Sequence, residues 1–288
     1  MPSAITHELI AQQTLSLLPA AAQIADTAPD YYYLGAQGGD LFFFYKPLSK
    51  KEGNFGKFLH RHGSYKLFSA MAEYLKEAET ERTQKATAYC LGYVSHYSAD
   101  VCFHPFVYNY LKAHDAKRSV HSLIENDWDV YFLRKKEGRE AEHYDFAFSA
   151  EKLGKEEILY DLFYDIAPAL GREEIKKRPF QRALKNFERF LHFFHGDCYD
   201  SAQGLSKIVG LKALARMYPR RTPEQDFLEG NDFFELSGGI AQNADELFNC
   251  AAGDSARRIS LFLNALSGAP LPREEFNKHL LTGKPQED

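Results

Sequence analysis

The sequence predicts an all-α protein built as a multi-helix bundle. Apolar residues recur at every third or fourth position in most segments, whereas the strict alternation of a half-buried strand is nowhere convincing. One segment, residues 85–113, is nearly apolar throughout and long enough to form a central helix. A chain of 288 residues can bury a sizeable core, and its 17 Tyr and 23 Phe predict that aromatic rings fill much of that core.

The first predicted helix covers residues 6–18, with Thr6 as its candidate N-cap. This start places His7 in the first helical turn. Residues 27–56 show no sustained helical period and are predicted to form a long loop, with aromatic runs on both sides of Gly-Gly-Asp40. Because such long loops are uncommon in compact proteins unless they serve a site, we expect the segment to be packed down with Asp40 held inside it.

Helical spacing resumes in residues 58–75, which carry His60 and His62, and continues in the central helix and in residues 119–134. Pro105 either kinks the central helix or begins a new one. Four further helical segments are predicted near residues 149–169, 172–196, 201–217 and 239–266.

The central helix contains the most specific pattern in the sequence, His96-x-x-x-Asp100-x-x-x-His104. A four-residue step turns about 400° on an α-helix, so the three side chains form one slightly drifting stripe. The pair His121-x-x-x-Glu125 repeats this spacing on the next helix. In a chain with 11 His and 40 acidic residues, chance gives about 0.06 matches to the triplet.

Imidazole nitrogens and carboxylate oxygens at this spacing are typical zinc ligands, although they also suit other divalent ions. A buried polar network without metal is the alternative for the triplet, and a solvated ion pair is the alternative for His121 and Glu125. Three ionisable groups on the face of an apolar helix would need partners, which favours the metal site.

Composition and charge limit the partners. The net charge of −5 comes from mixed acids and bases without a basic stripe, which argues against avid binding of duplex DNA. The four cysteines are scattered, form no C-x-x-C pair, and are expected to be free, buried thiols. Neither a secretory signal nor a run of eighteen apolar residues is visible, so the cytoplasm is the expected compartment.

The candidate ligands, taken together with their neighbours, resemble the zinc-dependent phospholipase C family over roughly residues 5–130. The residues that carry the resemblance are Thr6-His7, Leu34-Gly35-Ala36-Gln37-Gly38-Gly39-Asp40, Phe58-Leu59-His60, Gly92-Tyr93-Val94-Ser95-His96-Tyr97-Ser98-Ala99-Asp100, Phe103-His104-Pro105 and His121-Ser122-Leu123-Ile124-Glu125. Members of this family are helical proteins that hold three zinc ions in one cleft.

The resemblance implies the following ligand sets: Asp40, His60, His96 and Asp100 around one zinc; His104, His121 and Glu125 around a second; and His7 with a bridging Asp100 at a third. Secreted members complete the third site with the amino group of an N-terminal Trp. No Trp lies near His7 here, so this chain's own terminus or water would complete that site. His62 is an alternative to His60.

The resemblance further implies a zinc-dependent phosphodiester hydrolase with two to three ions. Asp40 would orient or deprotonate the attacking water. The substrate would be a phospholipid or a smaller phosphodiester, reached by transient contact with a membrane surface in the first case. The alternatives are a single-strand nuclease of the same fold and a non-catalytic metal-binding helical protein. We expect residues 1–144 to form the catalytic core and residues 145–288 to pack on it as a helical C-terminal region.

Overall fold

The computed structural model describes residues 3–47, 54–62, 64–76, 80–172, 175–195, 200, 203–204, 218–219 and 222–286. Helices dominate these residues, and no β-strand occurs among them, which confirms the all-α prediction. None of the helices found in these ranges is long and apolar enough to cross a membrane.

In chain order the helices are α1 (Ala4–Leu17), α2 (Pro19–Ala25), α3 (Pro29–Gly35), η1 (Asp40–Phe44), α4 (Phe55–Arg61), α5 (Ser64–Lys76), α6 (Glu81–Ala113), α7 (Ser119–Glu137), η2 (Ala141–His143), α8 (Ala150–Lys155), α9 (Ile158–Ile166), η3 (Pro168–Leu170), α10 (Lys177–His195), η4 (Gln225–Phe227), α13 (Phe233–Leu236), α14 (Ala244–Leu266) and α15 (Arg273–Phe276).

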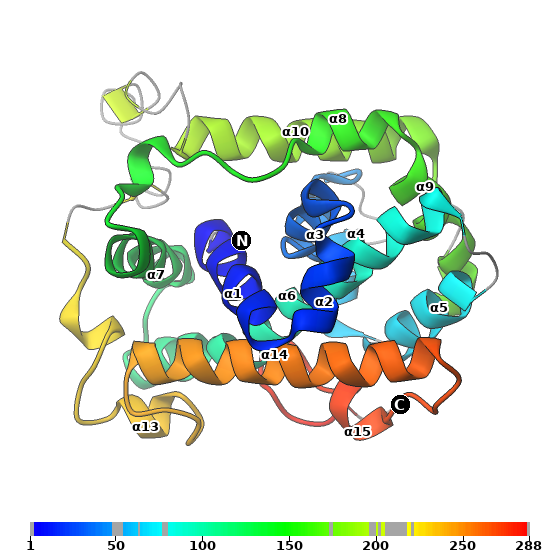
Figure 1. The fold of residues 1–288 in the computed structure, drawn as a ribbon. Coiled ribbons are helices and arrows are strands. Elements are labelled where there is room, and N and C mark those ends of the chain that lie inside the picture. Colours follow the sequence, from blue (N-terminus) through cyan, green and yellow to red (C-terminus); the bar gives the residue numbers. More distant parts are fainter. Residues whose placement is uncertain are drawn as a thin grey trace.

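Helix α6 is the centre of the bundle. Figure 1 shows α14 along one side of the molecule and α10 with α8 along the opposite side, with α1 and α3 between them. The main partners of α6 are α3 and α14. Thr80 caps α6 by accepting a hydrogen bond from the Thr83 amide at 3.2 Å, and the helix runs through Pro105 without ending. Pro105 therefore does not begin a new helix.

Two hydrophobic clusters share α6. Its earlier residues, up to Val101, pack with α2 to α5, α8 to α10 and part of α14, while its later residues, from Ala99, pack with α1, α7 and the remainder of α14. Asp100 lies where one cluster gives way to the other. Both clusters contain residues from before and after position 144. The division into a catalytic core and a C-terminal region stays a prediction.

Two glycines set the distance between α3 and α6. A Cβ on Gly92 would lie 2.0 Å from the Tyr32 carbonyl oxygen, and one on Gly35 would lie 2.1 Å from the Tyr89 carbonyl oxygen. Any side chain at either position would separate the two backbones, because real Cβ contacts are never so short. This close crossing brings the chain that follows α3 directly onto the face of α6 that carries His96.

Several predicted elements differ from the structure. The predicted loop at 27–56 contains α3 and η1, because helices of five to seven residues are too short to show a period in the sequence. Residues 58–75 form two helices rather than one, since His62 is extended. The segment 149–169 also divides, into α8, α9 and η3. The helix predicted at 201–217 falls almost entirely outside the described residues.

The remaining helix predictions, including those for α1, α6, α7, α10 and α14, are confirmed with shifted ends. The cysteine prediction is only partly correct. Cys90 and Cys102 are free and buried, as predicted, whereas Cys250 is free but exposed. Cys198 lies outside the described residues.

Candidate metal centre

Among the described residues, three groups of side chains place their ligand atoms within 4.8 Å of one another. The groups are His7, His96 and Asp100; Asp40, His60 and His96; and His104, His121 and Glu125. All eight residues predicted from the sequence are present, from five different helical elements. His96 belongs to two groups, so the first two form one continuous centre.

Asp100 is the hub of this centre. One carboxylate oxygen, Oδ1, lies 3.4 Å from Nε2 of His7. The other, Oδ2, lies 3.4 Å from Nε2 of His96 and 3.6 Å from Nε2 of His60. Nδ1 of His104, which belongs to the third group, also lies 3.7 Å from Oδ2. The two oxygens therefore face different histidines, as a carboxylate that bridges two cations requires.

His60 and His104 are oriented by backbone carbonyls. Nδ1 of His60 lies 2.7 Å from the Gly56 oxygen, and Nδ1 of His104 lies 3.0 Å from the Leu280 oxygen. A ring that donates its Nδ1–H to a carbonyl presents the Nε2 lone pair on its other side. In His60 that nitrogen is 3.0 Å from Oδ1 of Asp40. His62, the alternative, is exposed and lies outside all three groups.

Gly38 brings Asp40 to His60 and His96. Its φ of +48° lies in the left-handed region, and a Cβ there would overlap the His96 ring, 1.9 Å from Cδ2. The 3-10 turn η1 then begins at Asp40. Leu41 and Phe42 are buried just after it, so the expectation that this segment is packed down is correct.

His7 is positioned by a residue that the sequence reasoning missed. The carboxylate of Asp129, on α7, accepts hydrogen bonds from the Thr6 amide at 2.7 Å and from the Thr6 hydroxyl at 2.6 Å. It thus satisfies donors at the start of α1, where helices have no internal partners. Since Asp129 follows Glu125 by one helical turn, α7 anchors α1 and at the same time supplies His121 and Glu125 to the third group. The Glu125-x-x-x-Asp129 spacing was the available signal.

The third group joins α6 to α7. Oε1 of Glu125 lies 2.9 Å from Nε2 of His121 and 3.5 Å from Nε2 of His104. The Tyr108 ring packs edge-on against both imidazoles, with centroid distances of 5.9 Å to His104 and 5.4 Å to His121. These contacts hold the ligand atoms of the two helices together.

The acids and two of the histidines have the protonation states that metal binding requires. Burial opposes the charge of Asp100, but the charge of the His104 ring and the hydrogen bond from His7 outweigh it and hold the pKa of Asp100 well below its usual range. Burial likewise opposes the charge of Asp40, yet His60 lowers the pKa of Asp40 to about 2. Burial lowers the pKa of His96 to about 3, and the pKa of His121 is also lowered by burial. Ionised carboxylates and neutral imidazoles are the forms that bind divalent cations.

Buried polar atoms without a hydrogen-bond partner also indicate that the residues fit zinc. Several buried atoms at the centre have no hydrogen-bond partner among the described residues: Nδ1 of His7, both ring nitrogens of His96, and Oδ2 of Asp100. A buried polar atom without a partner costs about 1–3 kcal/mol, so this many at one place would be unfavourable in a purely structural network. Cations bound among them would satisfy the nitrogens and the oxygen that point inward.

The fold and this centre define a class of helical protein whose candidate metal ligands are gathered at one buried site. The model of the family described as "Zinc dependent phospholipase C" matches residues 6–170, which is more than half of the chain. The chain therefore belongs to the zinc-dependent phospholipase C family. No curated protein and no solved structure matches it significantly.

Proposed function

We propose that this protein is a zinc-dependent phosphodiester hydrolase of the phospholipase C type, with two to three zinc ions held by the eight candidate ligands. The observation that carries the proposal is that two ligand groups share His96, while Asp100 of the first group also lies near His60 and His104 of the other two. Adjacent cations can clamp the oxygens of one phosphate, which an isolated structural ion does not do.

In the proposed reaction, Asp40 acts on the water. Its side chain is 13% exposed, against 5% for Asp100, so Asp40 is the carboxylate of this pair that is open to an incoming substrate. An ionised Asp40, held by His60 at 3.0 Å, can accept a proton from water or orient it towards phosphorus. Zinc, when bound, supplies the Lewis acidity that lowers the pKa of water towards neutrality and offsets charge on the phosphate.

The histidines keep the carboxylates in place. His60 holds Asp40, and its own ring is held by the Gly56 carbonyl, so the orientation of Asp40 is fixed through two successive contacts. His104 is fixed in the same way by Leu280. Such outer contacts typically contribute about 10–100-fold to metal affinity or activity.

The substrate is tested directly. Zinc-loaded protein is assayed on phosphatidylcholine vesicles, on p-nitrophenyl phosphocholine and on single-stranded DNA, with a chelated sample as the control. Zinc-dependent release of phosphocholine or p-nitrophenol supports the proposal, whereas cleavage of DNA alone would assign a nuclease. Bound zinc without turnover on any of these substrates would indicate a non-catalytic metal-binding protein. Absence of zinc after reconstitution would refute the proposal altogether.

We also propose the cytoplasm as the compartment, because Cys90, Cys102 and Cys250 are free thiols, which a reducing environment preserves. Fractionation of the native host's cells would test it. Residues 1–144 hold all eight candidate ligands. The proposed role of the C-terminal region is to support them, as Leu280 does for His104.

A further inference from the structure

A polar cavity that includes none of the eight candidate ligands lies between α4, the start of α5 and residues 277–286. Its volume is about 790 Å³. Five of its lining residues are basic or histidine: Arg61, His62, Lys66, His279 and Lys284. No Asp or Glu is among the described residues that line it. Such a concentration of positive side chains contrasts with the net charge of −5 of the whole chain.

The positive charges are not neutralised within the described structure. Arg61, Lys66 and Lys284 form no ion pair with any described acid, although surface cations elsewhere do, such as Arg134 with Glu140. The Leu281 amide donates to Nδ1 of His279 at 3.1 Å, so the proton of that neutral ring is carried by Nε2. Among the described residues, the cavity therefore combines an imidazole N–H donor with three cations that form no ion pair, and no carboxylate lines it.

The walls of the cavity are tied together. The side-chain amide of Gln286 donates to the Arg61 carbonyl at 3.0 Å, which links the C-terminal segment to α4. Within that segment, the His279 amide donates to the Lys284 carbonyl at 2.8 Å, and an isolated bridge joins Lys278 to Pro285. The fold itself thus holds the walls of the cavity in place. Binding of an anion would not require these segments to become ordered.

The cavity adjoins the candidate metal centre. Arg61 and His62 directly follow His60 on the chain, and the residue after His279, Leu280, holds the His104 ring. The basic cavity and the candidate metal centre are therefore built partly from adjacent residues of the same two segments.

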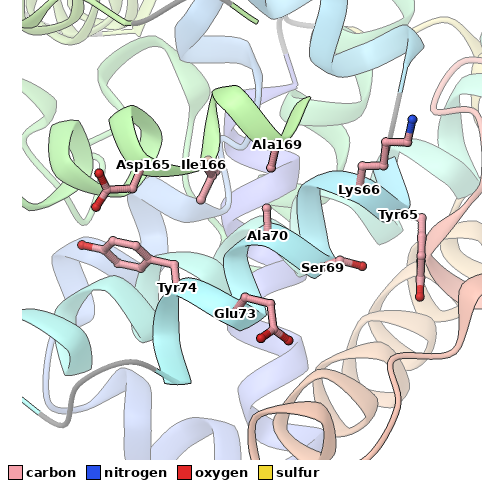
Figure 2. A pocket seen from close by; sticks show the side chains of 9 residues that line it. All are labelled: Tyr65, Lys66, Ser69, Ala70, Glu73, Tyr74, Asp165, Ile166 and Ala169. Atoms are coloured by element: carbon pink, nitrogen blue, oxygen red, sulfur yellow. The ribbon is translucent and has the colours of Figure 1, made fainter. Parts of the chain in front are cut away.

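A neighbouring groove is less favourable for an anion than the basic cavity. It shares Tyr65 and Lys66 with the cavity but continues along α5 to Glu73 and Asp165. Figure 2 shows Tyr65 and Lys66 at one end of this groove and Tyr74 with Asp165 at the other. Glu73 is paired with Lys76 at 2.9 Å, and the two carboxylates make the groove less positive than the cavity, so the cavity is the more favourable place for an anion.

We propose that the basic cavity binds a phosphate group, and that the phosphodiester cleaved at the metals carries this phosphate as a second anionic group. The second half of the statement rests on the proposed function. A phosphorylated lipid headgroup and a water-soluble phosphodiester with an extra phosphate share this chemistry. Arg is suited to the role because its planar fork of N–H donors matches phosphate oxygens.

The first experiment measures binding without turnover. Inorganic phosphate is titrated calorimetrically into zinc-loaded full-length protein and into the variants Arg61→Gln and Lys284→Gln. Each variant should weaken the cavity component about five- to tenfold, as expected for losing one charge-assisted contact. Phosphate bound at the metals contributes equally in all samples. The difference in phosphate binding between the samples therefore measures binding in the cavity.

The matched control is Lys57→Gln, which removes one charge from the same helix, four residues before Arg61, outside the cavity. It should change phosphate binding less than about twofold. Equal binding by wild type and both cavity variants would overturn the proposal, and so would an equal loss in Lys57→Gln. Thermal unfolding of each variant checks that the fold is retained.

The second experiment identifies the source of the phosphate. Vesicles containing phosphatidylinositol are compared with vesicles containing its monophosphate, and thymidine p-nitrophenyl phosphate is compared with the same ester phosphorylated on its second hydroxyl. A lower KM for the more phosphorylated member of either pair, lost in Arg61→Gln but kept in Lys57→Gln, supports a lipid or a soluble substrate respectively. Turnover without any such preference would overturn the substrate role. No turnover on any ester would refute the proposed function, while the phosphate titration would still decide whether the cavity binds phosphate.

Discussion

Replacing Asp100 with Asn tests the hub of the candidate metal centre. The amide keeps the shape of the side chain but removes its charge. Because Oδ1 faces His7 while Oδ2 faces His96 and His60, the change weakens two proposed ions at once. His104, His121 and Glu125 retain their own ligand atoms. With all three proposed sites filled, the wild type should hold three zinc ions and Asp100→Asn should hold one.

The stability change follows from this count. An ion present at about 100 times its Kd stabilises the folded protein by about 2.7 kcal/mol. Losing two ions therefore costs about 5 kcal/mol. For a chain of this size each kcal/mol corresponds to about 2 °C, so the Tm of zinc-loaded Asp100→Asn should lie about 10 °C below that of zinc-loaded wild type. In the presence of a chelator the two proteins should differ much less.

Elemental analysis after reconstitution and desalting measures the zinc, and thermal unfolding with and without chelator measures the stability. His7→Ala and His121→Ala are the controls, because each belongs to one ligand group and should lose a single ion. Equal zinc contents in Asp100→Asn and His7→Ala would refute the assignment of Asp100 as a bridge between two ions.

Three other predictions concern separate parts of the protein. Asp40→Asn, assayed at a zinc concentration that fills its sites, should lower kcat on the best substrate by about 10²–10⁴-fold, as for a lost general base; unchanged kcat would exclude a role for Asp40 in the reaction. Gly92→Ala should lower the free energy of unfolding by about 1–3 kcal/mol because its Cβ meets the Tyr32 carbonyl, whereas Gly253→Ala, which meets nothing within 4 Å, should be neutral or stabilising in chemical denaturation. Burial lowers the pKa of His195 to about 4, so the unfolded chain binds more protons between about pH 6.5 and 4, and wild type should lose about 3 kcal/mol more stability across that window than His195→Gln; parallel stability curves for the two proteins would contradict this.

The short-range features of the site followed directly from the sequence. His96, Asp100 and His104 had to share one helical face once residues 85–113 were helical, and the same holds for His121 and Glu125. The structure confirms both helices. The resemblance carried by the residues around these motifs added the family, and the match over residues 6–170 shows that family.

Segments shorter than two turns could not be read in the same way. Helix α3 and the turn η1 lie where a loop was predicted, because a period cannot be recognised in five to seven residues. The choice between His60 and His62 was also open. It depends on where α4 ends, at Arg61, which leaves His62 extended and exposed while His60 still faces the centre.

The sequence by itself determined which side chains share a helix face, since the geometry of an α-helix fixes the positions of residues four apart. Only the tertiary structure decided which faces meet. The close crossing at Gly35 and Gly92, the anchoring of Thr6 by Asp129, and the contact of His104 with Leu280 join residues up to 176 positions apart. Distances between separate elements depend on how all the side chains in the core pack together, and no local pattern encodes them. The basic cavity between α4 and residues 277–286 arises in the same way, from the packing of two distant segments against each other.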